Sequence, residues 1–136
     1  MRVTNYSIAA GLTWVCVLGS AAAADLTGAE IQSFMSGKTG YVETTAASVT
    51  GTPGQGAIYW AADGSGLYKT PQGPTWHGTW SVKGDMYCSE WKEATAKRPC
   101  MKLEKQGETV SFIDSESGQV RIKVTKTVPG NAENLK

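Results

Sequence analysis

The sequence has very few of the side chains on which most catalytic and metal sites depend. It contains one histidine, His77, and three cysteines among 136 residues. A Ser–His–Asp triad could be built only around His77, and a zinc site of imidazole and thiolate ligands would lack donors. The charge is also almost balanced, with 13 Lys and Arg against 12 Asp and Glu. A protein that binds nucleic acid normally has a clear basic excess, so we expect no nucleic-acid partner, no cofactor and no metal site.

Long apolar runs are confined to the start of the chain, where residues 8–19 follow the positively charged Arg2. The small residues Ala22, Ala23 and Ala24 come next, in the pattern of a signal-peptidase site. The run is too short for a stable transmembrane helix. We therefore predict a signal peptide at 1–24 and a single domain at 25–136, located in the periplasm or secreted, with no stable membrane insertion after the leader is removed. Cys16 would leave with the leader.

A short helix is predicted at the start of the mature domain. Thr27 and Glu30 have the spacing of a capping box, with Thr27 as the N-cap. Gly37 follows as a C-terminal glycine would. We expect a helix over about residues 27–36 that covers an opening or a side of the domain with one apolar face, formed by Ile31, Phe34 and Met35.

After Gly37 the sequence alternates between apolar and polar residues, with glycine, proline or Asp-Gly between the runs. This pattern predicts a mainly β fold. The expected strands are 39–45, 57–61, 66–70, 76–82, 86–92, 100–105, 109–114 and 119–127. Short connections favour antiparallel pairing of neighbours, and eight such strands suit a closed meander barrel. An open sheet packed on the helix is the second choice.

The alternation also predicts which residues face inward. Trp80 and Trp91 fall on inward faces, and both are expected to be buried, whereas Cys88 and Cys100 fall on outward faces. A Cys88–Cys100 disulfide would therefore join neighbouring strands from outside, and export to an oxidising compartment favours it. On the last strand the same alternation places Arg121 outward, between the inward residues Val120 and Ile122.

Two resemblances follow from these motifs. The residues Leu26-Thr27-Gly28-Ala29-Glu30-Ile31, then Gly78-Thr79-Trp80-Ser81-Val82 with Gly84-Asp85, Cys88, Trp91 and Cys100, resemble those of a group of small secreted bacterial proteins with one disulfide. The Gly78-Thr79-Trp80 signature is also similar, more loosely, to that of lipocalin-type barrels, although in that family it lies on the first strand. The lipocalin resemblance implies a closed meander that carries small apolar ligands.

The polar residues do not form a pattern typical of catalysis. His77 lies on a polar strand face, which favours an ordinary exposed histidine. The acids Asp63, Asp85, Glu90 and Glu93 have no spacing that singles out a pair, so we interpret them as solvated.

The aromatic residues either line a cavity or fill a small barrel, since an eight-stranded barrel is just wide enough for side chains or for one small ligand. We favour a largely filled barrel with at most a pocket at one mouth. The candidate ligand-binding residues are Trp60, Trp76, Trp80, Tyr87 and Trp91. Residues 44–56, rich in Thr, Ala and Gly, are either a mobile flap over that mouth or a hairpin extension without a role.

Together these observations predict a non-catalytic, monomeric binding protein that holds a small apolar or aromatic ligand at the barrel mouth. The alternative is a protein-interaction module, such as an inhibitor of a periplasmic protease. A cavity between the aromatic residues would favour the first.

Overall fold

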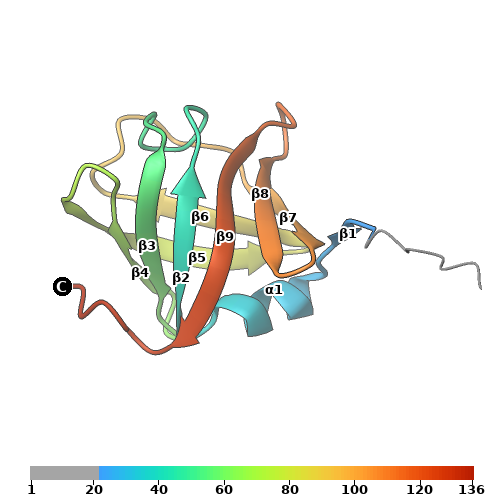
Figure 1. Cartoon of the computed structure of the whole chain (residues 1–136), viewed down its shortest axis with the longest axis horizontal. Helices are drawn as coiled ribbons and strands as arrows, with labels where there is room; N and C mark the ends of the chain where they lie inside the picture. The colour runs from blue at the N-terminus through green and yellow to red at the C-terminus, as the bar shows by residue number, and fades with distance from the viewer. Residues whose placement is uncertain (1–21) are drawn as a thin grey trace, which may run out of the picture.

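The computed structural model describes residues 22–136, and it shows a closed antiparallel barrel of eight strands with one additional short strand and one short helix. Figure 1 shows the barrel with the helix at one end. The elements are β1 (Ala24–Asp25), α1 (Gly28–Met35), β2 (Lys38–Thr44), β3 (Gly54–Trp60), β4 (Ser65–Lys69), β5 (Thr75–Lys83), β6 (Met86–Trp91), β7 (Met101–Gln106), β8 (Thr109–Asp114) and β9 (Val120–Pro129).

Each strand from β2 to β9 pairs with its neighbour in the sequence, and β2 also pairs with β9. This last pairing closes the meander, so the barrel prediction is confirmed over the open sheet. Most strand bounds differ from the prediction by one or two residues. The exception is β3, which begins at Gly54 because Gly54 and Gln55 continue the ladder opposite Thr44 and Glu43.

Helix α1 begins as predicted. The Thr27 hydroxyl accepts a hydrogen bond from the Glu30 N–H, and the Glu30 carboxylate accepts one from the Thr27 N–H. At the other end, Gly37 takes a positive φ of 72°, which glycine adopts without strain. The Gly28 N–H donates to the Asp85 carboxylate at 2.7 Å, which ties the helix to the β5–β6 turn. Ile31 and Met35 are fully buried in the core, so the helix covers this end of the barrel.

The core near α1 is built around three aromatic side chains that all contact one another. Trp60 meets Tyr87 edge to face and stacks on Phe112, with ring centroids 6.4 Å and 6.2 Å away, and the Tyr87 and Phe112 centroids are 5.3 Å apart. Its indole Nε1 donates to the Tyr87 hydroxyl at 3.2 Å. Gly40 lies beneath the Trp60 ring, where a Cβ would overlap it. The core half nearest α1 is therefore filled, as expected for a small barrel.

The seam between β6 and β7 is the shortest strand pairing of the barrel. Only Tyr87 and Met101 are partners in the ladder, and Cys88 lies one residue further, opposite Cys100. The two cysteines form the predicted disulfide, with Cα atoms 4.5 Å apart. Further along β7, strand β1 takes the place of β6 by pairing with Glu104 and Lys105. Beyond the disulfide, β6 continues to Trp91 with β5 as its one partner strand.

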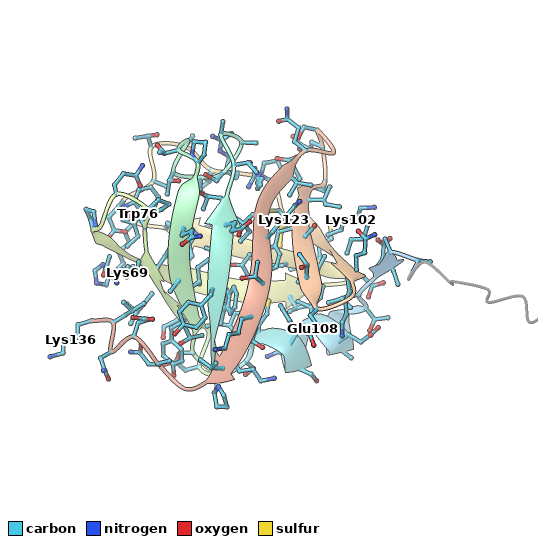
Figure 2. The ribbon with its side chains drawn as sticks, viewed as in Figure 1. Lys69, Trp76, Lys102, Glu108, Lys123 and Lys136 are labelled. Atoms are coloured by element: carbon cyan, nitrogen blue, oxygen red, sulfur yellow. A yellow bond between two sulfur atoms is a disulfide. The ribbon has the colours of Figure 1, made fainter. Side chains whose placement is uncertain are left out.

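The register puts the charged residues of the long strands on the outside, as Figure 2 illustrates for Lys69, Lys102 and Lys123. Two charged residues, Asp114 and Arg121, depart from this rule. A β-bulge between β8 and β9 pairs Phe112 with Ile122 and Ile113 with Val120, which leaves Arg121 as the extra residue. The outward placement of Arg121 predicted from alternation was wrong, because the bulge interrupts the period of two and Arg121 is only 3% exposed.

Candidate functional site

A cavity of about 940 Å³ lies at the barrel end opposite α1 and continues over the outward residues Thr79, Ser81 and Lys83 of β5. Its inner wall is formed by core residues of five strands: Ile58, Tyr68, Tyr87, Met101 and Ile122. Its outer wall includes the segment 92–100, which connects β6 to β7. Residues from both faces of β6 line it, so we place its opening where β6 runs on beyond the disulfide without β7 beside it. The volume lies in the range typical of small-molecule sites.

Three of the five aromatic residues predicted for a ligand site line this cavity: Trp80, Tyr87 and Trp91. Trp91 is half-buried and its ring centroid lies 5.5 Å from that of Tyr68. The ring rests against Gly66 and Gly78, where an added Cβ would crowd or overlap it. The two glycines therefore allow a large indole to lie close to the sheet.

The structure places the other two predicted residues outside the lining. Trp60 is completely buried in the aromatic core described above. Trp76 is half-buried and contacts Tyr68 edge to face, with centroids 6.2 Å apart. Both therefore support the cavity wall from behind rather than border the space.

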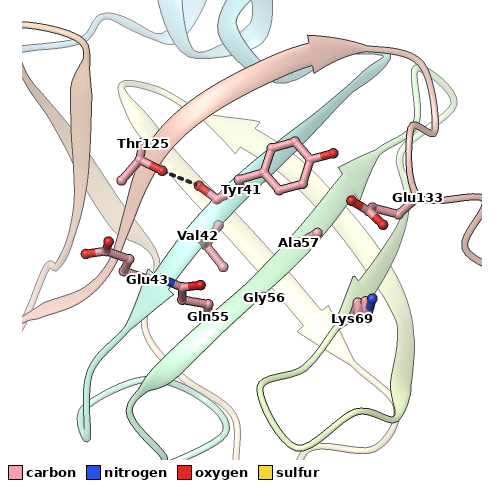
Figure 3. Close-up of a pocket in the computed structure, with 9 residues that line it drawn as sticks. All are labelled: Tyr41, Val42, Glu43, Gln55, Gly56, Ala57, Lys69, Thr125 and Glu133. Atoms are coloured by element: carbon pink, nitrogen blue, oxygen red, sulfur yellow. Dashed lines mark hydrogen bonds between the residues drawn. The ribbon is translucent and has the colours of Figure 1, made fainter.

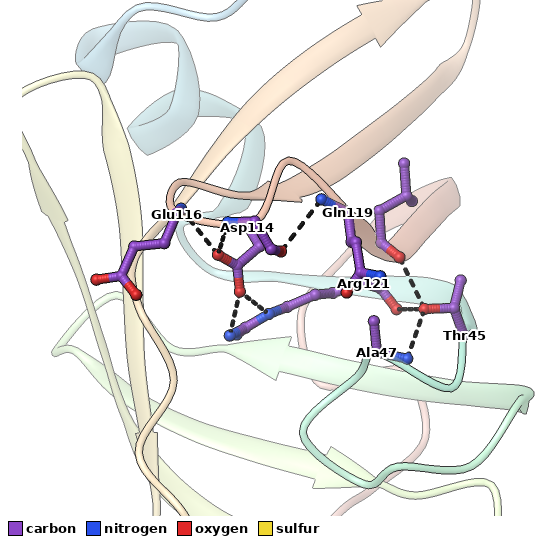
Figure 4. A network of polar contacts seen from close by, with 8 residues as sticks. Thr45, Ala47, Asp114, Glu116, Gln119 and Arg121 are labelled. Carbon is purple, nitrogen blue, oxygen red and sulfur yellow. Dashed lines mark hydrogen bonds and ion pairs between the residues drawn. The ribbon is translucent and has the colours of Figure 1, made fainter.

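Arg121, which lines the cavity, forms a buried ion pair with Asp114, as Figure 4 shows. Arg121 donates from Nε to the Asp114 Oδ2 at 2.9 Å, and its Nη2 lies 2.7 Å from the same oxygen. The other carboxylate oxygen of Asp114 accepts from the N–H groups of Glu116 and Ser117. The N–H of Ser117 is the main cause of a lowered pKa for Asp114, and the Arg121 charge adds to it. Burial lowers the pKa of Arg121, while Asp114 acts in the opposite direction.

Two buried polar atoms at the cavity have no hydrogen-bond partner among residues 22–136. They are the hydroxyl of Tyr68 and Nη2 of Arg121, whose 2.7 Å contact with Asp114 does not have hydrogen-bond geometry. Burial raises the pKa of Tyr68 to about 12, so the phenol is a donor at neutral pH. The Thr50 hydroxyl is near enough to lower this pKa, but the two hydroxyls do not form a hydrogen bond. Buried groups without a partner are uncommon in folded proteins.

The connection between β2 and β3, residues 45–53, reaches this end of the barrel as expected for the segment 44–56. Val49 lines the cavity and packs against the core, and Ser48 is buried. The Thr45 hydroxyl lies 2.7 Å from the Val120 carbonyl oxygen, and the Thr44 hydroxyl donates to Thr52 at 2.7 Å. These bonds fasten the segment at both ends.

Positive side chains surround the opening. Lys92, Lys97 and Arg98 line it from the segment 92–100, and the Arg98 charge is close enough to act on Arg121. Glu90 partly offsets them through an exposed ion pair with Lys97 at 3.3 Å. The entrance is therefore more favourable to an anion than to a cation.

A smaller depression of about 290 Å³ lies on the outside of β2 and β3, as Figure 3 shows. Its lining is mostly polar, with Glu43, Gln55, Lys69 and Glu133 around Tyr41. A hydrogen bond with Glu133 is the main cause of a raised pKa for Tyr41. This depression offers little apolar surface.

His77 lies on the outer face of β5, as predicted. Its Nδ1 is 2.8 Å from the Glu93 carboxylate, and its Nε2 is 3.0 Å from the Lys136 carbonyl oxygen. The hydrogen bond with Glu93 is the main cause of a raised pKa for His77. These contacts fasten the C-terminal segment to the outside of the barrel.

Within residues 22–136, no group of three His, Cys, Asp or Glu side chains is placed to hold a metal ion. In the same part of the chain, no helix has the length and apolar character needed to cross a bilayer.

Alternation alone could not indicate Tyr68, Arg121 or Val49 as cavity residues. Tyr68 was one aromatic residue among several, Arg121 was assigned to the outside, and Val49 lies in a segment without periodicity. The sequence signal for the buried position of Arg121 lay in its partner, Asp114. The Asp114 carboxylate accepts hydrogen bonds from the N–H groups of the turn residues Glu116 and Ser117, which follow it in the sequence.

Comparison with protein-family models, with curated proteins and with solved structures finds no match to this chain.

Proposed function

We propose that this protein is a non-catalytic, exported binding protein that holds a small, largely apolar or aromatic molecule in the mouth of its barrel. The single observation that carries the proposal is the cavity of about 940 Å³, which is bordered by Trp80, Tyr87 and Trp91. Ligand sites are typically concave and mostly apolar, with a few polar groups that fix orientation. The inner wall of this cavity has that composition, with Arg121 and Tyr68 as its buried polar groups, whereas the outer wall is largely polar.

The way the barrel is held together supports the same proposal. Folding buries apolar surface at the α1 end with a filled aromatic core, whereas at the opposite end it leaves a space in contact with buried aromatic rings. A stabilised barrel around such a space is suited to enclosing a molecule that water solvates poorly. The disulfide and the fastened segment 45–53 keep the walls of the space in place.

The neutral fluorescent probe N-phenyl-1-naphthylamine tests this function, because its emission rises when it leaves water. We expect a saturable rise with the mature protein. Val49→Trp should weaken binding by roughly tenfold, because the larger side chain occupies the mouth. Tyr59→Trp is the control, since it places the same indole on the outward side of β3 and should leave binding unchanged.

The absence of saturable binding by any apolar probe would refute the carrier function. Recovery of one dominant protein in a pull-down from periplasm would then favour the interaction module. Turnover of an ester, peptide or glycoside that is lost in His77→Ala would contradict both.

A further inference from the structure

We infer that the molecule held in the cavity is an apolar carboxylate, whose carboxylate accepts hydrogen bonds from the Tyr68 hydroxyl and the Arg121 guanidinium. This inference rests on the proposed function and specifies the ligand of the same site. Its starting point is that both side chains are buried and border one cavity, that the Tyr68 Oη has no hydrogen-bond partner within residues 22–136, and that the only polar contact of the Arg121 Nη2 in that part of the chain is its ion pair with Asp114.

The donor character of these two atoms determines what can satisfy them. An arginine side chain has only donors, and a tyrosine that is neutral at physiological pH presents an O–H. A ligand that satisfies both donors must therefore have a hydrogen-bond acceptor. Tyr68 is 1% exposed and Arg121 is 3% exposed, so such an acceptor would be shielded from water, where a hydrogen bond counts for more.

The charges around the cavity favour an ionised acceptor over a neutral one. Asp114 already balances the charge of Arg121, but the segment 92–100 adds Lys92, Lys97 and Arg98 to the lining. Glu90 and Asp63 are the acids of the lining, fewer than its cations. Of these three cations, Arg98 is the one whose positive charge acts on Arg121, where it lowers the pKa of the guanidinium. A carboxylate can bond the guanidinium and gain from this positive surrounding.

The remainder of the ligand must be apolar, and aromatic character suits it. Beside the two donors the cavity is bordered by the rings of Trp80, Tyr87 and Trp91 and by aliphatic side chains. Flat rings stack or meet edge to face with such neighbours. A naphthalene-sized carboxylate therefore matches both parts of the site.

Three naphthalenes of similar size separate the contributions of the ligand's charge, its hydrogen-bond acceptor and its apolar ring to the affinity. 2-Naphthoate carries a charged acceptor, 2-acetylnaphthalene a neutral acceptor and 2-ethylnaphthalene none. Equilibrium dialysis at pH 7.5 gives the affinity of each for the mature, oxidised protein. We expect 2-naphthoate to bind most tightly and 2-ethylnaphthalene least. A hydrogen bond to a charged group contributes enough to separate these two by roughly tenfold or more.

Tyr68→Phe removes one hydroxyl and keeps the ring. It should weaken 2-naphthoate binding by about tenfold and leave 2-ethylnaphthalene unchanged. The same change should not lower the melting temperature, because the lost hydroxyl has no partner in the fold. Tyr59→Phe, on the outward side of β3, is the matched control and should alter none of the affinities.

Equal affinity for all three naphthalenes, with N-phenyl-1-naphthylamine still bound, would overturn this inference and leave the proposed function standing. Equal affinity for 2-naphthoate and 2-acetylnaphthalene would overturn the assignment of a carboxylate. Failure to bind the neutral probe as well as all three naphthalenes would remove the proposed function itself.

Discussion

Removal of the Cys88–Cys100 disulfide should weaken the barrel at one identifiable place. The cysteines are 12 residues apart in the sequence, and closing a loop of this size stabilises the fold by about 3 kcal/mol in the chain-entropy model. For a domain of this length that amounts to a fall in melting temperature of roughly 10 °C. Tyr87 and Met101 form the one other ladder contact between β6 and β7, so the seam has little else to hold it.

Thermal unfolding followed by circular dichroism measures the loss in a Cys88→Ala/Cys100→Ala variant. The wild-type protein should melt lower when reductant is added, whereas the variant should not respond to it. Hydrogen exchange adds a spatial test, because β6 and β7 should lose protection while β2, β3 and β9 keep theirs. A loss below about 1 kcal/mol, or a uniform loss of protection, would refute the idea that the disulfide holds this seam.

Three further changes test the core, the ion pair and the C-terminal contact. Trp60→Ala should lower the unfolding free energy by roughly 3–5 kcal/mol, because the Trp60 ring is fully buried. Trp76 is half-buried, so Trp76→Ala should cost clearly less in the same denaturant titration. Equal losses would contradict the core assignment. Arg121→Met should cost about 3–5 kcal/mol because it leaves Asp114 as a buried charge without its partner, and chemical denaturation that finds no change would show that the pair is solvated. The pKa of His77 is raised in the folded state, so the contribution of its ion pair with Glu93 to stability is complete below about pH 6.5 and is lost as the pH rises through the folded pKa. An NMR titration should find the His77 pKa above 6.5, and Glu93→Gln should lower it. A His77 pKa that does not change in that variant would contradict the role of the carboxylate.

Much of the fold could be predicted from the sequence, because its signals are local. The capping box at Thr27 and Glu30 and the glycine at position 37 determined the helix. The alternation of apolar residues determined the inward faces and placed the two cysteines opposite each other outside the barrel. Strand β1 gave no such signal, because its two residues pair only where β6 leaves the edge of β7 open.

The site was less predictable, because it depends on interruptions of the regular pattern. The bulge in β9 turns Arg121 inward, and no feature of its own residues marks the place where the period of two fails. The division of the aromatic residues into core and cavity wall also depends on the three-dimensional arrangement. Trp60 and Trp80 are both buried and both inward, yet only Trp80 borders the space. Which buried atoms are left without a partner cannot be determined before the whole barrel is assembled.

The glycine pair beneath Trp91 gives the cavity an adjustable dimension. Gly66 and Gly78 are partners across β4 and β5, and the indole rests where their side chains would be. A methyl group at Gly66 would press the ring away from the wall and into the space, so the site would become shallower. At Gly78 a methyl group would also overlap the Glu90 backbone carbonyl and would disturb the pairing of β5 with β6. The depth of the space is thus set by the hydrogen atom at Gly66, which is the position at which to re-engineer the barrel for smaller guests.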